Sequence, residues 1–274
     1  MYIVDIMGGF GNQLFQICFA LYLKQQGKKP YLYIFNKHNH NDHNFYMIND
    51  EDFDLTPINL VFETSIKKLK SVGFLDRSIF SIVKQDSIED IKKCEIKNKK
   101  LVTSFNGFWQ DKYFVDQVFD EFKEGLLKTK AFDDSLKKKA LEGSTMLHVR
   151  RGDHQAYLPL TYYEDALIEA SKIDNFIFDI YTDDVEWVKN KNEFKNARNI
   201  YGPSDKADIK SDTLNTFANM LNYDNFIISN STYSWWAAKI SEKDYSKVYY
   251  PYPHWPKQNY HPDIYYDNWI RINR

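Results

Sequence analysis

The chain has 274 residues, of which 43% are hydrophobic and 27% charged, and its formal net charge is -2. This size and composition predict one large globular domain or two of ordinary size, and they exclude a disordered chain. The small net charge argues against a protein that mainly neutralises nucleic-acid phosphates. The 20 Tyr, 20 Phe and 6 Trp residues are mostly core and strand filling, although sugar-binding proteins also stack carbohydrate on such rings.

The first part of the chain is typical of the β-turn-α-β unit that opens a Rossmann-like sheet. We expect a strand at 2–6, a helix at 12–26 that ends at Gly27, and a second strand at 31–35. Residues 36–60 are polar and loop-like, 61–100 look helical and basic, and 101–105 resemble a strand. The segment FWQDKYFVDQVFDEFKEGLLK then predicts a turn and an amphipathic helix. Cys18, inside the first helix, is expected to be a buried apolar side chain.

The alternation of strands and helices restarts after the charged segment 130–143, where we expect a domain boundary. Strands are predicted at 145–149, 176–181, 199–200, 225–229 and 248–250, with helices at 161–171, 185–190, 213–221 and after SNSTYS. The prediction is an α/β chain of two Rossmann-like domains, residues 1–140 and 141–274, which face each other across a cleft. The motifs GGFGNQ, HVRRGDH, TDD and SNSTYS each follow a predicted strand, which is where ligands bind such sheets.

The turn GGFGNQLFQ resembles half of a dinucleotide-binding fingerprint. Leu14 stands where the third glycine is required, and the second strand runs into Asn36 instead of an acid that would bind ribose. A nicotinamide or flavin site is therefore disfavoured. The turn still offers close backbone approach and the amides of Asn12 and Gln13, which can bond sugar hydroxyls or phosphate oxygens.

The motif HVRRGDH places two arginines at the end of a predicted strand. An arginine held there suits a phosphate, because its fork donates two parallel hydrogen bonds and stays charged. Asp153 is expected to hold one arginine in place. The alternative is a surface ion pair, which the position in a βα turn makes less favoured.

The hydroxyl run SNSTYSWWAA lies at a strand-to-helix junction. Its backbone N–H groups, hydroxyls and helix N-terminus can form an anion cradle. N-capping by Ser231 or Thr232 is the alternative, and both can hold together. Trp235 and Trp236 are expected in the core.

Two acidic or histidine-rich segments raise the question of a metal. Asp183 and Asp184 are interpreted as a helix cap and a supporting acid, since metal-dependent transferases usually carry Asp-x-Asp. His38, His40 and His43 have no regular ligand spacing. A metal site is disfavoured at both places.

In chain order, GGFGNQLFQ, FWQDKYF, HVRRGDH, YYEDAL, YTDDVEWVK and SNSTYSWWAA resemble the motifs of glycosyltransferase family 11, the bacterial α-1,2-fucosyltransferases. The likeness covers essentially the whole chain. It implies a GT-B-like fold, GDP-fucose as donor, inversion at the fucose anomeric carbon, a terminal galactose 2-OH as acceptor, and no cofactor or required metal. The alternatives are a different nucleotide-sugar transferase and a non-catalytic sugar- or nucleotide-binding protein.

The resemblance also implies roles for individual residues. Arg150 matches the arginine that contacts the donor's β-phosphate, His148 lies near guanine, and the hydroxyl run contacts phosphate. Candidates for the base are Asp153, His154 and Asn12. The full donor-binding set is Gly9, Phe10, Gly11, Asn12, Gln13, His148, Arg150, Asp183, Asp212, Asn230, Ser231 and Thr232.

The chain departs from the family pattern at two positions. His154 stands where many members have Tyr, and Thr216 stands where many have Asp, with Asp212 nearby, so the carboxylate that recognises guanine stays open. The first domain is expected on the acceptor side, with 36–60 and the segment around Trp109 as its walls.

We expect no signal peptide, no membrane span and a cytoplasmic protein of surface-polysaccharide synthesis. No nucleic-acid partner is expected. Peripheral contact with a membrane through the lysines at 67–70 and 97–100 stays an alternative to simple solvation of those charges.

Overall fold

The computed structural model describes residues 1–34, 50–57, 80–84, 88–92, 101–152, 157–203, 209–255 and 262–273. The chain divides into two compact units, Met1–Lys128 and Thr129–Arg274. The division falls earlier than the predicted boundary after residue 140, because helix α5 (Lys130–Lys137) belongs to the second unit. Its Phe132 packs edge-on against Phe217 of that unit, with ring centroids 5.5 Å apart.

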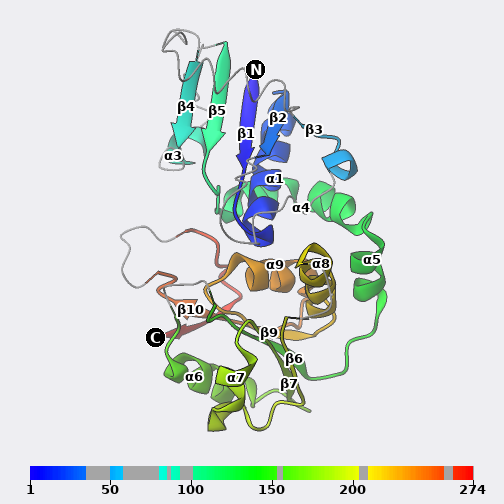
Figure 1. The fold of residues 1–274 in the computed structure, drawn as a ribbon, viewed down its shortest axis with the longest axis vertical. Coiled ribbons are helices and arrows are strands. Elements are labelled where there is room, and N and C mark those ends of the chain that lie inside the picture. Colours follow the sequence, from blue (N-terminus) through cyan, green and yellow to red (C-terminus); the bar gives the residue numbers. More distant parts are fainter. Residues whose placement is uncertain are drawn as a thin grey trace. The chain divides into compact units, whose positions relative to one another are not determined.

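The first unit is a parallel sheet of order β3-β2-β1-β5-β4 (Figure 1). The strands are β1 (Tyr2–Ile6), β2 (Pro30–Ile34), β3 (Thr56–Pro57), β4 (Phe80–Lys84) and β5 (Val102–Asn106). The helices are α1 (Phe10–Gln25), α3 (Ile88–Lys92) and α4 (Lys112–Leu127), with a short 3-10 turn at Asp50–Phe53. The expectation of helix throughout 61–100 is wrong at β4, which pairs in parallel with β5.

The core of the first unit forms between the sheet and the helices α1 and α4. Phe19 of α1 stacks on Trp109 with centroids 4.3 Å apart and meets Phe105 of β5 edge-on. The ring of Phe114 in α4 packs against the ring of Phe19, with centroids 5.1 Å apart. Cys18 is buried here, as predicted. Trp109 is fully buried as well, so its ring belongs to the core, and the acceptor wall expected around it stays a prediction.

The second unit is a parallel sheet of order β11-β10-β9-β6-β7-β8. Its strands are β6 (Ser144–Val149), β7 (Ile177–Thr182), β8 (Asn199–Tyr201), β9 (Asn225–Ile227), β10 (Val248–Tyr252) and β11 (Ile270–Asn273). Its longer helices are α6 (Leu160–Ala170), α8 (Ile209–Met220) and α9 (Thr232–Ser241), with the short α7 (Val185–Lys189) and a 3-10 turn at Asn192–Phe194. Strand β11 was not expected from the sequence.

Helices cover both faces of the second sheet: α6 and α7 lie on one face, and α8 and α9 on the other (Figure 1). The α6 face buries Leu147, Val149 and Ile180 against Tyr162 and Tyr163. On the opposite side Trp235 and Trp236 of α9 are buried and meet edge-on at 4.9 Å, so both tryptophans are core residues, as predicted. The predicted α/β class with two Rossmann-like parallel sheets is confirmed.

Candidate functional site

The strand order of the second sheet creates a topological switch point. From β6 the chain moves outward to β7 and β8 on one side, and it then crosses to β9 on the other side of β6. The carboxyl ends of β6 and β9 therefore flank a topological switch point, which is the usual ligand crevice of open α/β sheets. The motifs HVRR and SNST lie at these two ends.

His148 joins the two strands at the switch point. Its side chain is buried, and its Nδ1 lies 2.8 Å from Oγ of Ser229, which follows β9. The imidazole ring lies 6.1 Å from the ring of Tyr233 in α9. The sequence singled out His148 and the hydroxyl run that contains Ser229 and Tyr233, but it did not predict these contacts between them.

The N-terminus of α9 opens at the same place. Ser231 is its N-cap, and its Oγ accepts a hydrogen bond from the backbone N–H of Tyr233 at 3.4 Å. Thr232 is the first helical residue, and Asn230 before the cap is buried. The predicted cap is confirmed. The first turn of α9 contains no acid, so the positive end of its dipole stays uncompensated within the helix.

Asp183 follows the neighbouring strand β7 and contacts the turn at residues 150–152, which we call the arginine turn. Its Oδ2 lies 3.1 Å from Nε of Arg150, and its Oδ1 accepts a hydrogen bond from the backbone N–H of Arg151 at 2.7 Å. Asp183, which was expected as a supporting acid and as a donor-binding residue, therefore anchors both arginines. The expected role of Asp153 in holding an arginine stays a prediction. Asp153 and His154 lie outside the described residues.

The second acid of the pair has a purely local task. Asp184 caps α7 by accepting from the backbone N–H of Trp187 at 2.9 Å. The structural interpretation of Asp184 is therefore confirmed. Within the described part of the chain, His, Cys, Asp and Glu side chains form no cluster of three or more that could hold a metal ion. His38, His40 and His43 lie outside that part.

The start of α8 connects to the same group of residues. Tyr233 donates its hydroxyl hydrogen to the backbone carbonyl of Thr213 at 2.6 Å. Burial is the main cause that raises the pKa of Tyr233, the negative charge of Asp212 adds to the rise, and the positive charge of Arg150 opposes it. Asp212 lies in the first turn of α8, and its role in donor binding stays a prediction.

The first unit has a switch point of its own, between β1 and β5. The helix α1 begins at Phe10, two residues before the predicted start at residue 12, with Gly9 as its N-cap. Gly8 adopts φ +76°, and a Cβ there would lie 2.9 Å from Nδ2 of Asn12, so the turn requires glycine. Phe10 and Gly11 are buried in the first turn of α1.

The amides of this turn have separate tasks. Gln13 is 1% exposed and donates through Nε2 to the carbonyl of Gly8 at 2.9 Å, so its amide closes the turn. Gln16 accepts from the backbone N–H of Met7 and donates to the carbonyl of Gly107, which ties β1 to the segment after β5. Asn12 is half-buried and accepts from Nε2 of Gln110 at 2.9 Å.

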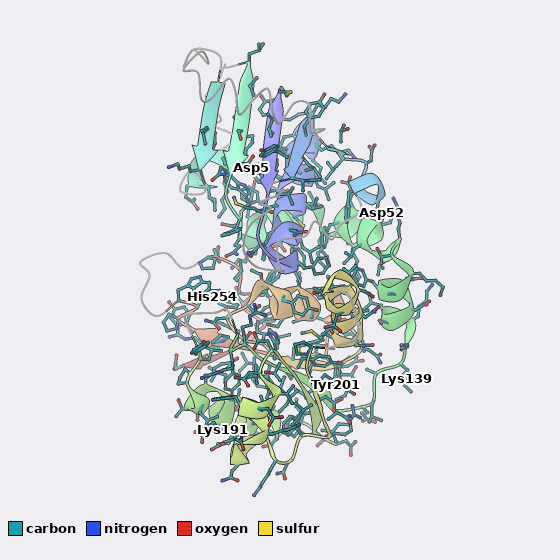
Figure 2. The ribbon with its side chains drawn as sticks, viewed as in Figure 1. Asp5, Asp52, Lys139, Lys191, Tyr201 and His254 are labelled. Atoms are coloured by element: carbon teal, nitrogen blue, oxygen red, sulfur yellow. The ribbon has the colours of Figure 1, made fainter. Side chains whose placement is uncertain are left out.

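Asp5 lies on β1 beside this turn (Figure 2). It accepts from Nδ2 of Asn106 at 2.7 Å and from Oγ of Ser104 at 3.4 Å, both on β5. These contacts and those of Gln16 make the polar edge of the first unit rigid. Of its amides, Asn12 is the half-buried one that we retain as a ligand contact, whereas Gln13 and Gln16 build the turn.

Gly152 gives a test of how the arginine turn is held. A Cβ at this position would lie 2.9 Å from Oδ2 of Asp183 and 3.2 Å from its Cγ. We expect Gly152→Ala to displace Asp183, release Arg150 and lower turnover by about 10²-fold, since small misplacements of catalytic groups cost that much. Steady-state kinetics measures the effect.

A double-mutant cycle supplies the control for Gly152→Ala. In an Asp183→Ala background the clash is gone, so adding Gly152→Ala should change turnover by less than about twofold. If the two substitutions instead multiply their effects, Gly152 acts through something other than Asp183.

The fold and the site define a class: a Rossmann-like α/β protein with an anchored arginine and a helix N-terminus at the switch point of its second sheet. The family model "Glycosyl transferase family 11" matches residues 9–273, and the chain belongs to this family of glycosyltransferases. The predicted family is therefore confirmed.

Two curated relatives from Escherichia coli match nearly end to end. The O-antigen biosynthesis glycosyltransferase WbnK is 27% identical, with 97% of this chain and 99% of that protein covered. An alpha-1,2-colitosyltransferase is 24% identical, with 99% of each chain covered.

A solved structure shares the fold. A mutant of Arabidopsis thaliana FUT1 in complex with GDP superposes with a TM-score of 0.52 at 13% sequence identity, over 92% of this chain and 71% of that one. At this identity the likeness concerns the fold alone, and the predicted GT-B-like class is confirmed. Within the described residues, each helix is too short or too polar to cross a membrane.

Proposed function

We propose that this chain is an inverting galactoside α-1,2-fucosyltransferase, which moves fucose from GDP-fucose to the 2-OH of a terminal galactose during surface-polysaccharide synthesis. The observation that carries the proposal is Arg150, held by Asp183 at 3.1 Å beside the switch point where α9 begins. A fixed guanidinium and a helix N-terminus are what a departing nucleoside diphosphate needs. Membership of family 11 and the relative that acts in O-antigen biosynthesis support the choice.

In the proposed reaction the acceptor oxygen forms a bond to the anomeric carbon as the bond from that carbon to the β-phosphate oxygen breaks. GDP leaves with the electron pair. Arg150 and the hydroxyls and N–H groups of residues 229–234 stabilise the charge that develops on the β-phosphate. This positive charge is part of the protein, so the proposal requires no metal ion, and EDTA should leave activity intact.

The base, where one is needed, is Asp153 or His154. Asn12 stays in the proposal as a hydrogen-bonding residue, because a neutral carboxamide donates and accepts hydrogen bonds but does not take up a proton at neutral pH. The hydrogen bond from Gln110 Nε2 to Asn12 Oδ1 fixes the orientation of the Asn12 amide. His148 and Asp212 are proposed to lie at the guanine.

The test is a transfer assay with GDP-fucose and either lactose or lacto-N-biose. Linkage analysis of the product should find fucose on O2 of galactose with inverted configuration. A catalytically inert chain, or one that transfers fucose to another hydroxyl, would refute the proposal. Full loss of activity in EDTA would instead return attention to a metal at Asp183 and Asp184.

A second candidate is transfer of a different deoxysugar. The relative named as an alpha-1,2-colitosyltransferase is nearly as similar to this chain as the O-antigen enzyme, at 24% against 27% identity. Direct competition between GDP-fucose and the corresponding colitose nucleotide decides between the donors. Preference for the colitose donor by more than about tenfold in kcat/KM would favour the second candidate.

A further inference from the structure

The second arginine of HVRRGDH is held very differently from the first. Two aromatic rings lie against its guanidinium: the Arg151 Cζ is 4.2 Å from the ring centroid of Tyr157 and 4.1 Å from that of Trp187. Both distances are well inside the range of cation–π contact, and a planar guanidinium stacks on aromatic rings. We call these three residues the arginine stack.

The arginine stack connects three parts of the second unit. Arg151 follows β6, Trp187 belongs to α7 and Tyr157 precedes α6. The hydroxyl of Tyr157 also donates to the backbone carbonyl of Gly152 at 3.4 Å. The place of Trp187 is itself fixed, because Asp184 caps α7 at the backbone N–H of Trp187.

We propose that Arg151 is a positioning residue and that the arginine stack sets the orientation of Arg150. The two arginines are consecutive and share one anchor, since Asp183 accepts from the Arg151 backbone N–H through Oδ1 and contacts Arg150 Nε through Oδ2. The arginine stack fixes the side chain of Arg151, whose backbone N–H is already held by Asp183. The β6 turn, residues 150–152, is thereby held both through the backbone and through the side chain of Arg151. Arg150, which precedes Arg151, is therefore held in one orientation. Only the catalytic consequence of this inference rests on the proposed function.

The nature of the contact separates this role from that of a second phosphate ligand. A phosphate ligand acts through its charge and its hydrogen-bonding fork, and it needs no aromatic ring beside it. A stacked guanidinium acts through its plane, which lysine lacks. Removal of either aromatic ring should therefore disturb Arg151 under the positioning role and have no effect under the ligand role.

The experiment uses the full chain with Arg151→Lys, Trp187→Leu and Trp187→Phe. Hydrogen exchange of a peptide that covers 149–152 reports whether the Arg151 amide stays bonded to Asp183, and it needs no activity. We expect exchange at this amide to rise at least tenfold in Arg151→Lys and Trp187→Leu and to return toward wild type in Trp187→Phe, which keeps a ring. Turnover should fall about tenfold in the first two variants and recover in the third.

Tyr245→Leu is the matched control, because Tyr245 is an exposed ring that faces a cation, Lys243, at 5.4 Å, far from the β6 turn along the chain. It should leave exchange at 149–152 unchanged. If Trp187→Leu does not fold, the exposed Tyr157→Leu replaces it. Exchange within twofold of wild type in Arg151→Lys and in the ring variant overturns the inference. A wild-type chain that turns over no GDP-fucose contradicts the proposed function alone, since the exchange result still decides the role of the stack.

Discussion

Arg150→Ala is expected to abolish fucose transfer, lowering kcat by about 10²–10³-fold or more. The guanidinium is the fixed cation at the switch point, where its Nε is 3.1 Å from Asp183, and a neutral methyl group leaves the departing diphosphate without that charge. The loss should be mainly in kcat, because the negative charge on the β-phosphate grows in the transition state. Radiometric transfer from GDP-fucose measures it.

Two variants make the Arg150 result specific. Arg150→Lys keeps the charge but not the fork, so we expect partial activity between wild type and alanine. Arg271→Ala removes an exposed arginine of the same unit that lies over the ring of Tyr252, and it should leave turnover unchanged. Near-normal turnover in Arg150→Ala would contradict the proposal that Arg150 stabilises the charge on the β-phosphate.

Arg198→Ala is expected to lower the free energy of unfolding of the second unit by about 1–3 kcal/mol, the cost of removing one partner from a buried polar group. The Arg198 side chain is 42% exposed, so the loss stays below that for a fully buried ion pair. Asp179 in the middle of β7 is fully buried and accepts from Arg198 Nε at 2.9 Å, from Tyr223 Oη at 2.7 Å and from Asn199 Nδ2 at 3.0 Å. Removal of Arg198 strands a buried carboxylate. Urea unfolding measures the change.

A second substitution controls for the Arg198 effect. Asp179→Asn in the Arg198→Ala background removes the stranded charge and should restore part of the lost stability. Equal stability of the single and double variants would mean that the arginine contributes through packing instead of charge.

The same network predicts how stability depends on pH. Burial alone would raise the pKa of Asp179, but hydrogen bonds from Arg198 and Tyr223 outweigh it, so its pKa is lowered. A carboxyl with a lowered folded pKa contributes stability that is present above its unfolded pKa of about 3.9 and is lost as pH falls through the folded value. Wild type should therefore lose more stability than Asp179→Asn between about pH 5 and pH 3.

The sequence was most informative where strand ends carry polar motifs. Parallel strands bring their carboxyl ends to one edge of a sheet, so motifs after β6, β7 and β9 had to converge. Arg150, Asp183 and Ser231 could be selected on that basis, whereas His148 was selected through the resemblance to family 11. The three unexpected strands, β3, β4 and β11, are edge strands, and β4 exposes Ile82, which weakens its alternation as a signal.

Contacts between distant residues explain what the sequence could not supply. Nothing local distinguishes Asn12 from Gln13, yet Gln13 closes its own turn, whereas Asn12 pairs with Gln110 from the segment after β5. Likewise, Arg150 pairs with Asp183 from the next strand. Such pairings depend on the order of the strands in the sheet, and a short stretch of sequence does not contain that order.

The central claim is that a guanine nucleoside diphosphate binds at the switch point of the second sheet. Hydrogen exchange of the wild-type chain with saturating GDP, and separately with UDP, tests it most directly. We predict that GDP slows exchange at residues 149–152 and 229–234 and that UDP does not. Binding of GDP without protection of either segment, or equal protection by UDP, would contradict the account.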